Sequence, residues 1–409
     1  MKRLLAALLA GIIAVSMLGC SQDSSKASSD NKNKQSATQS SSNAAVNRNG
    51  QVRSYLTGQW VDKSVNSMRP LAVMMSNQPE APSQSGLSDA KIIYEAPAEG
   101  NYSTRLMGLF EDWEKVKKIG SIRSCRNCYV YFMKEFDAIY VHAGQSMPAL
   151  ELVTSDYIDN ISTMDKDFNK VFYQDLELSM PHNTFTTGEG AMAGAKSRGY
   201  NLTHASDYKG KFLFNEDDDK KIELTDGDTA NYVYVGYGIN KPWFAFNKDD
   251  GKYYRFQHKK GVAEKQSDAD DGKQAAVDNI ILQYCYFDHY LWEEEETLYW
   301  DITLTGSGKG KFITNGKSID ITWKKDSEFG ITKYYDSKGK EITLNQGKTW
   351  VCIINNATTK DIEISAVENI KKQTPVLPVV VTPEPSTEAE NEGESENEPQ
   401  AEAGINEDY

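Results

Sequence analysis

The sequence predicts an α+β protein, in which an N-terminal α/β domain with a mixed sheet is followed by an antiparallel β domain. Two observations predict this arrangement. Between residues 53 and 208, short apolar runs alternate with segments of helical periodicity, which is the pattern of an α/β domain. Between residues 209 and 360, short strand-like segments follow one another and are separated by turns such as Asn-Gly and Asp-Asp-Gly, as in a meander or sandwich.

The elements of the N-terminal region follow from its hydrophobic pattern. The run 71–75 is continuously apolar, which is typical of a strand buried on both faces. In the segment 124–136, the cysteine and aromatic residues recur at helical spacing. Ser146 precedes another helical segment and is its predicted cap, with Pro148 in the first turn. The predicted strands are 71–75, 91–95, 105–110 and 138–142, and the predicted helices are 124–136, 146–153 and 189–198.

The C-terminal region is rich in aromatic and β-branched residues arranged in short segments, which favours strands. Alternating aromatic residues in these segments are typical of a strand core, although a surface that stacks on sugar rings is an alternative. The predicted strands are 232–235, 243–246, 253–256, 279–284, 300–304, 310–314, 318–323, 332–335 and 349–354.

The first twenty residues predict a lipoprotein signal peptide. Lys2 and Arg3 precede an apolar stretch over residues 4–18, which is too short for a membrane-spanning helix. Gly19 and Cys20 close this stretch in the pattern of a bacterial lipobox. We therefore expect lipidation of Cys20 and attachment to the outer face of the cell membrane. The alternative is an ordinary signal peptide with a chance cysteine.

Two segments have the composition of disordered chain. Residues 21–52 are rich in Ser, Asn, Gln and Lys, which suits a tether between membrane and folded body. Residues 375–409 form an acidic tail, with ten acidic residues and no Lys or Arg from Glu384 to Asp408. The rest of the chain has no basic stripe, and the sequence therefore predicts no nucleic-acid partner.

Four cysteines remain when Cys20 is assigned to the lipid. Cys125 and Cys128 have C-x-x-C spacing, but the surrounding residues do not favour a redox motif. A structural zinc site is not predicted either, because the chain lacks a second C-x-x-C motif. Cys285 and Cys352 lie in two strand-like segments. They either form a disulfide, which export would permit, or remain as two buried thiols.

Polar residues that could form a site are concentrated in the N-terminal region, near the predicted strand ends, where α/β sheets usually bind ligands. Glu95 and Glu99 are the hypothetical catalytic pair, since two carboxylates can act as acid and base on a glycan. Arginine can hold a carboxylate or phosphate in a bidentate manner. The hypothetical ligand-binding residues are Asn77, Arg105, Arg123, Arg126, His142, His182 and Asn183. We predict no metal site and no cofactor.

Several distinctive motifs occur in order along residues 69 to 355. They include Arg69-Pro-Leu-Ala-Val-Met-Met-Ser-Asn77, Ile93-Tyr-Glu95, Gly120-Ser-Ile-Arg-Ser124, Phe136-Asp-Ala-Ile-Tyr-Val-His-Ala-Gly144, Pro181-His-Asn-Thr184 and Gly347-Lys-Thr-Trp350. These motifs resemble those of the YerB-like family of bacterial lipoproteins, although Cys125 and Cys128 depart from its usual pattern. The family is a domain of unknown function, so the resemblance implies N- and C-terminal domains of its type and an envelope location, but no reaction.

These observations predict an extracytoplasmic lipoprotein with a binding or adaptor role, whose partner is a cell-wall polymer or an envelope protein. Peptide, muramyl and teichoic-acid groups carry the anions that arginine recognises. The alternative is a hydrolase of cell-wall glycan or peptide that uses Glu95 and Glu99. A Ser–His–Asp hydrolase has no local support, because the chain contains no G-x-S-x-G motif.

Overall fold

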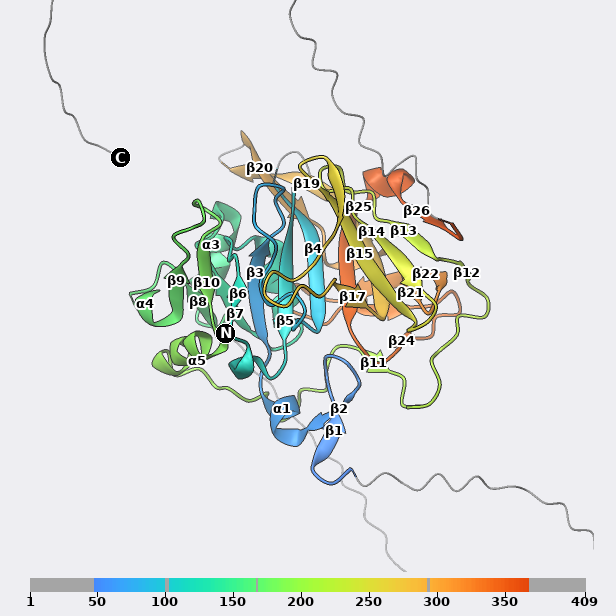
Figure 1. Cartoon of the computed structure of the whole chain (residues 1–409), viewed down its shortest axis with the longest axis horizontal. Coiled ribbons are helices and arrows are strands. Elements are labelled where there is room, and N and C mark those ends of the chain that lie inside the picture. Colours follow the sequence, from blue (N-terminus) through green and yellow to red (C-terminus); the bar gives the residue numbers. More distant parts are fainter. Residues whose placement is uncertain (1–47, 100–102, 167, 293–294, 368–409) are drawn as a thin grey trace, which may run out of the picture. The chain divides into compact units, whose positions relative to one another are not determined.

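The computed structural model describes residues 48–99, 103–166, 168–292 and 295–367. These residues belong to one compact unit (Figure 1). Within them, no helix is long and apolar enough to cross a membrane. The predicted lipidation at Cys20, the signal peptide and the acidic tail lie outside the described residues.

Two sheets form most of the fold. The larger has thirteen strands, with the path β12-β22-β21-β18-β25-β4-β5-β3-β7-β8 and the additional strands β19, β20 and β23. Their bounds are β12 Asp228–Thr229, β22 Lys317–Lys325, β21 Gly306–Thr314, β18 Asn279–Cys285, β25 Thr349–Asn355, β4 Ile92–Glu99, β5 Ser103–Phe110, β3 Leu71–Ser76, β7 Ile139–His142, β8 Asn160–Ser162, β19 Phe287–Trp292, β20 Glu295–Ile302 and β23 Lys333–Tyr335.

The second sheet has six strands, with the path β16-β15-β14-β13-β26 and β17 beside β15. Its strands are β16 Val262–Lys265, β15 Lys252–Lys259, β14 Trp243–Asn247, β13 Tyr232–Tyr234, β26 Glu363–Ser365 and β17 Ala276–Val277. Smaller sheets contain β6 Ile119–Gly120, β9 Phe172–Gln174 and β10 Thr184–Thr186; β1 Gln51–Arg53 and β2 Trp60–Asp62; and β11 Leu213–Phe214 and β24 Thr343–Leu344. The helices are α1 Lys63–Ser67, η1 Trp113–Lys115, α2 Asn127–Lys134, α3 Met147–Val153, α4 Phe168–Val171, α5 Gly188–Ser197 and η2 Asn356–Asp361.

The structure confirms the mixed α+β content and the strands and helices predicted from the sequence, with bounds that differ by a few residues. It differs from the prediction in how the strands pair. β25 runs parallel to β18 on one side and parallel to β4 on the other, so the C-terminal region is not purely antiparallel. Six of the seven residues of β25 are buried, and only a central position in a covered sheet can bury a strand on both faces. As a result, the regions on either side of residue 208 share one sheet.

The large sheet separates two hydrophobic cores. Successive residues of β25 alternate between them: Val351 and Ile353 lie in the core that contains α2, and Cys352 lies in the other. The second core also contains Phe244 of the six-stranded sheet and the alanines of α5. Helix α2 therefore covers one face of the large sheet, and the six-stranded sheet and α5 cover the opposite face.

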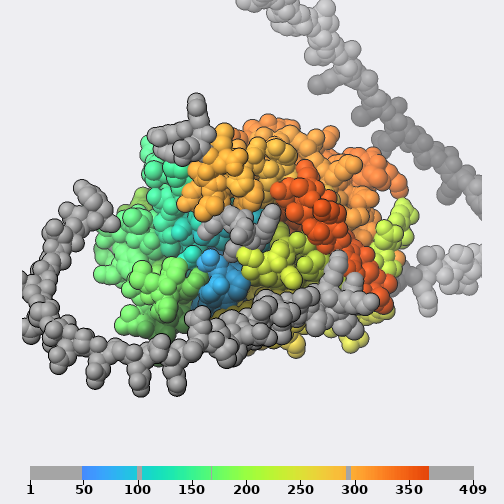
Figure 2. Space-filling view, turned by 90° about the horizontal axis from the view of Figure 1, so that it is seen from above, coloured from blue at the N-terminus to red at the C-terminus, as the bar shows by residue number. Residues whose placement is uncertain are grey.

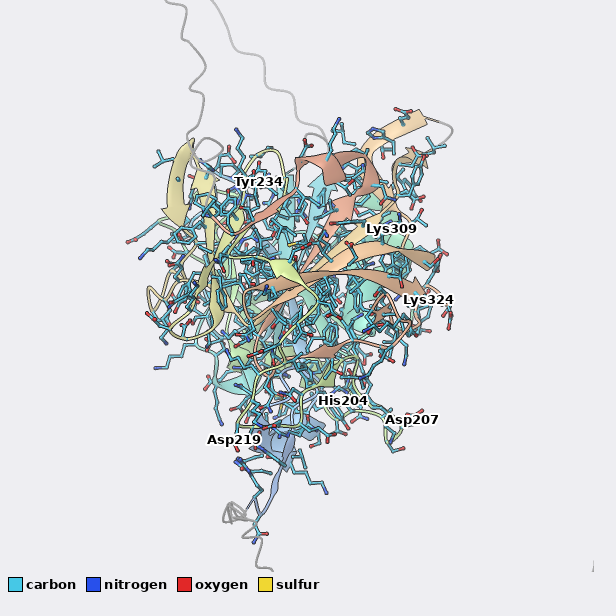
Figure 3. The ribbon with its side chains drawn as sticks, turned by 90° about the vertical axis from the view of Figure 1, so that its right-hand side faces the viewer. His204, Asp207, Asp219, Tyr234, Lys309 and Lys324 are labelled. Atoms are coloured by element: carbon cyan, nitrogen blue, oxygen red, sulfur yellow. The ribbon has the colours of Figure 1, made fainter. Side chains whose placement is uncertain are left out.

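Residues 48–52, which the sequence assigned to the tether, are part of the folded body. β1 pairs with β2, and the guanidinium groups of Arg48 and Arg53 lie over the ring of Trp60 at 4.7 and 4.2 Å. Both arginines also pair with Asp218. Figure 3 shows the neighbouring Asp219 beside these strands, and Lys309 and Lys324 at the surface of the β21–β22 hairpin. The polar composition of residues 48–52 concealed these pairings.

A buried carboxylate joins helix α2 to the C-terminal region. Glu135 follows α2 and binds the ammonium groups of Lys211 and Lys325, of which Lys325 lies at 2.6 Å. It also accepts hydrogen bonds from the backbone N–H and the hydroxyl of Thr332. Burial raises the pKa of Glu135, but the two ammonium charges outweigh this effect and leave the pKa below its ordinary value. Burial lowers the pKa of Lys211 to about 8.

We predict that Glu135→Gln lowers the free energy of unfolding by about 3–5 kcal/mol at pH 7, because it leaves two buried ammonium groups without a counter-charge. Urea denaturation measures this. The folded-state pKa is depressed, so the ionised carboxylate stabilises the fold fully above the ordinary pKa of 4.5. The difference between wild type and variant should therefore shrink as the pH falls below that value.

The same substitution at Glu341 is the control, because its ion pair with Lys333 is partly exposed to solvent. Glu341→Gln should change the free energy of unfolding by no more than about 1 kcal/mol. Equal effects of the two variants would contradict the role of Glu135.

Candidate functional site

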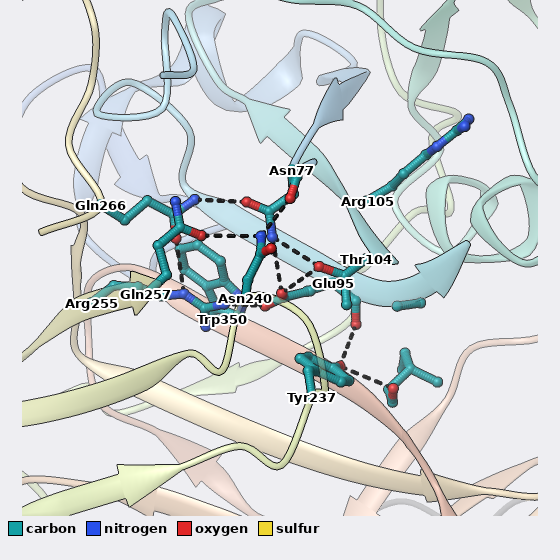
Figure 4. Close-up of polar contacts among 12 residues, drawn as sticks. Asn77, Glu95, Thr104, Arg105, Tyr237, Asn240, Arg255, Gln257, Gln266 and Trp350 are labelled. Atoms are coloured by element: carbon teal, nitrogen blue, oxygen red, sulfur yellow. Dashed lines mark hydrogen bonds and ion pairs between the residues drawn. The ribbon is translucent and has the colours of Figure 1, made fainter. Parts of the chain in front are cut away.

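Glu95 is at the centre of a buried polar network (Figure 4). Oε2 accepts hydrogen bonds from Nη2 of Arg255 at 2.6 Å and from Nε1 of Trp350 at 3.0 Å. Oε1 accepts from the amide of Asn77 at 3.2 Å and from the hydroxyl of Thr104 at 2.8 Å. Four donors therefore occupy the two carboxylate oxygens, and the side chain is fully buried.

Arg255 holds the other half of this network. Its guanidinium carbon lies 4.2 Å from the ring centroid of Trp350 and 4.7 Å from that of Phe244, so two aromatic rings cover the charge. Its Nε donates to Gln266 at 3.0 Å, and the amide of Gln266 donates to Asn77 at 3.2 Å. The ring of contacts thus begins and ends at residues that bind Glu95.

The network connects strands of the large sheet with the six-stranded sheet. Glu95 lies on β4 and Trp350 on β25, whereas Arg255 lies on β15. Nearby, the hydroxyl of Tyr237 donates to the backbone carbonyls of Glu95 and Ile353, both at 3.0 Å. Since no position around the carboxylate of Glu95 is open to a substrate, its geometry fits a role in holding the two sheets together.

Glu99 lies at the end of β4, where its backbone pairs with Ser103 and Tyr299; its side chain is outside what the structure describes. The complete burial of Glu95, with four donors on its carboxylate, does not favour the hypothetical carboxylate pair.

The predicted basic residues do come together. We call Arg105, Arg123, Arg126 and His182 the arginine cluster. The carbonyl of Ser124 accepts hydrogen bonds from Arg105 at 2.5 Å and from Arg126 at 3.4 Å. Figure 4 shows the guanidinium group of Arg105 directed away from the Glu95 network.

Arg123 and His182 are the partly exposed members of the arginine cluster. Arg123 donates to the carbonyl of Pro181 at 2.9 Å and to Gln78 at 3.1 Å, and Nδ1 of His182 lies 3.4 Å from the hydroxyl of Ser76. Burial lowers the pKa of His182, and the charges of Arg123 and Arg105 add to this effect. Arg105 and Arg126 are buried, so Arg123 and His182 form the part of the cluster that reaches the surface at the end of β3.

The C-terminal region contributes to the edge of this surface. The guanidinium carbon of Arg126 lies 5.3 Å from the ring centroid of Tyr299 on β20. In the space-filling view of Figure 2, the teal surface of the N-terminal region adjoins the orange surface that contains β20. The ring of Tyr299 therefore packs on a buried member of the arginine cluster.

Three predicted ligand-binding residues are not members of the cluster, and all three are buried: Asn77, which belongs to the Glu95 network, His142 and Asn183. His142 has Nδ1 at 2.7 Å from the carbonyl of Gly144 and Nε2 at 3.1 Å from the side chain of Asn160. Burial lowers the pKa of His142. The backbone carbonyl of Asn183 accepts a hydrogen bond from Asp175. Among the described residues, no group of three His, Cys, Asp or Glu side chains could hold a metal ion.

Sequence reasoning missed Arg255, Gln266 and Trp350. A signal existed for Arg255, because it alternates with Tyr253 and Gln257, and alternate residues of a strand face the same side. Tyr253, Arg255 and Gln257 are all buried, so this side of the strand faces the interior. The partner of Arg255 could not be found this way, because it lies 160 residues earlier in the chain.

The four remaining cysteines are buried free thiols. A disulfide between Cys285 and Cys352 is excluded by strand register: Cys352 pairs with Leu282, and Cys285 pairs with Asn355. The two thiols also belong to the cores on opposite faces of the sheet. Burial raises the pKa of Cys125 and of Cys285 to about 12, and that of Cys128 and Cys352 also rises.

The fold and network define a mixed α+β protein in which an N-terminal and a C-terminal segment share a central sheet. Residues 56–201 match the family described as protein of unknown function (DUF3048) N-terminal domain, and residues 233–351 match the DUF3048 C-terminal domain. The chain belongs to the DUF3048 family. The network joins its two matched segments, since Glu95 lies in the first and Arg255 and Trp350 lie in the second.

A relative and a solved structure come from Bacillus subtilis. "Putative lipoprotein YerB" of strain 168 is 29% identical over 303 residues, which are 74% of this chain and 86% of the relative. The crystal structure of the YerB protein aligns with a TM-score of 0.65 at 28% identity, and it covers 77% of this chain and 99% of that chain. The resemblance inferred from the sequence motifs is thereby confirmed.

We predict that the Glu95–Arg255 contact is energetically coupled. Glu95→Gln and Arg255→Gln should each destabilise the protein, because each leaves a buried partner without its counter-charge. The double variant should be less destabilised than the sum of the single variants by about 1–3 kcal/mol. Urea denaturation of the four proteins measures this coupling, and additive effects would contradict it.

We also predict that Cys125, Cys128, Cys285 and Cys352 do not react with a disulfide reagent at pH 8 in the folded protein. Only the thiolate reacts, and burial disfavours it at all four positions. All four should react after denaturation in guanidinium. Rapid labelling of Cys125 or Cys128 in the native state, located by mass spectrometry, would refute this.

Proposed function

We propose that this protein is an extracytoplasmic, lipid-anchored binding protein that recognises anionic groups of the cell wall through its arginine cluster. The observation that carries the proposal is the convergence of Arg105, Arg123 and His182 at one end of β3. Arginine presents a planar set of donors that matches a carboxylate. The family relationship to a protein described as a lipoprotein supports the envelope location.

Binding is favoured over hydrolysis because of the state of the two candidate carboxylates. Glu95 is fully buried, with donors on both oxygens, and Glu99 follows it by four residues of the same strand. By contrast, Arg123 and His182 have partly exposed side chains that a polymer at the surface can reach. Hydrolysis of wall glycan or peptide is the alternative that the experiment must separate from binding.

We predict that the purified full-length protein, in detergent micelles, co-sediments with cell-wall sacculi. Arg123→Gln should weaken this binding about tenfold or more, since a hydrogen bond to a charged group contributes about 1.5–3 kcal/mol. Binding should also weaken with added salt, because Arg123 is partly exposed. The measurement is the bound fraction in the pellet as a function of protein concentration.

The control is Arg48→Gln, the same change at an arginine of the β1–β2 region. It should leave sedimentation unchanged. Sacculi stripped of teichoic acid distinguish peptide carboxylates, which remain, from polymer phosphates, which are lost. Muropeptides released by wild type but not by Glu99→Gln would support the hydrolase, and the absence of both binding and release would refute the proposal.

A further inference from the structure

A second basic site lies where the two family segments meet. It is a pocket of about 330 Å³ whose basic side chains are Lys252, Lys273 and Lys348. Lys252 begins β15, Lys273 precedes β17, and Lys348 precedes β25. The N-terminal segment supplies Ser88 and Ile93 to the same pocket. Its residues differ from those of the arginine cluster.

The Gly347-Lys-Thr-Trp350 motif builds this pocket. Gly347 has a φ of +126°, and a Cβ atom there would collide with the carboxylate of Asp278, so glycine is required. The next backbone N–H, that of Lys348, donates to the same carboxylate at 3.0 Å. The ammonium group of Lys348 donates to the carbonyl of Ser88. The motif therefore holds Lys348 of the C-terminal segment against Ser88 of the N-terminal segment.

The electrostatics of the pocket favour an anion. Burial lowers the pKa of Lys348 to about 8, and the charges of Lys91 and Lys252 act in the same direction. Asp89 and Asp278 oppose this shift without cancelling it. Lys273 is mostly exposed and pairs with Asp271 at 2.8 Å. A ligand that brings negative charge would relieve the repulsion among these ammonium groups.

The shape and composition of the pocket restrict the ligand further. Several ammonium groups match an anion with more than one charge, and a phosphate monoester carries about −1.5 to −2 at neutral pH. Lysine binds phosphate as a point charge without the planar geometry that arginine supplies. Leu87, Ile93 and Val277 add apolar walls beside the lysines. We propose that this pocket binds the phosphate group of a small phosphate monoester.

Isothermal titration calorimetry of the full-length protein with glycerol 3-phosphate tests the proposal. We expect wild type to bind, and Lys348→Gln to bind about tenfold more weakly or not at all. Lys252→Gln changes a partly exposed strand residue and should also weaken binding of glycerol 3-phosphate. It replaces Lys348→Gln in the test if that variant fails to fold. Lys338→Gln is the matched control, because this exposed lysine lies outside the pocket and should leave binding unchanged.

Two further arms identify the source of the phosphate. Vesicles containing phosphatidic acid report a lipid phosphate monoester, whereas glycerol 3-phosphate reports a soluble one. Binding in either arm that is lost in Lys348→Gln or Lys252→Gln, but kept in Lys338→Gln, supports the phosphate site. Failure to bind in both arms, equal binding of acetate, or equal loss in all three variants would overturn it. These outcomes are independent of sedimentation with sacculi.

Discussion

The ion pair between Glu95 and Arg255 is the constraint on which the arrangement of the two sheets depends. A carboxylate and a guanidinium group are both removed from water, which is costly unless each finds a partner and its remaining hydrogen-bonding positions are filled. Asn77, Thr104 and Trp350 donate to the carboxylate of Glu95, and Gln266 accepts from Nε of Arg255. Nη1 of Arg255 is the exception, because it is buried and has no hydrogen-bond partner among the described residues. Because these residues come from segments far apart in the chain, a displacement of either sheet would leave a charge buried without its partners.

The same principle applies at Glu135, on the face of the large sheet that carries α2. There one carboxylate binds two lysines, so the centre holds an excess positive charge, and rings of Phe136, Phe212 and Tyr334 lie about 5.4–5.8 Å from Lys211. Both buried carboxylates, Glu95 and Glu135, precede residue 208. Their basic partners, Lys211, Arg255 and Lys325, follow it. Each therefore specifies how the N-terminal and C-terminal segments fit together, whereas hydrophobic contacts alone tolerate small shifts.

Much of the fold could be predicted from local patterns, and the part that could not depends on contacts between distant residues. The apolar run at residues 71–75 and the helical spacing of Cys128, Tyr131 and Phe132 each describe their own element. The run 349–354 predicts a buried strand, yet nothing in it shows that its neighbours are β4 and β18. In the same way, the sequence marks Glu95 as a hypothetical catalytic carboxylate, but it does not show the partners Arg255 and Trp350 that bury this side chain.

The position of β25 has a consequence for the order in which the molecule can be completed. A chain is made from its N-terminus, so Ile92 and its strand exist long before Thr349, the residue that Ile92 pairs with. Until that late strand arrives, one edge of β4 and one edge of β18 present unpaired backbone groups beside apolar side chains, a surface that invites association with other chains. A chain that ends before residue 349 would therefore lack a central strand of the large sheet rather than an outer one. We expect such a fragment to aggregate instead of folding as a smaller protein.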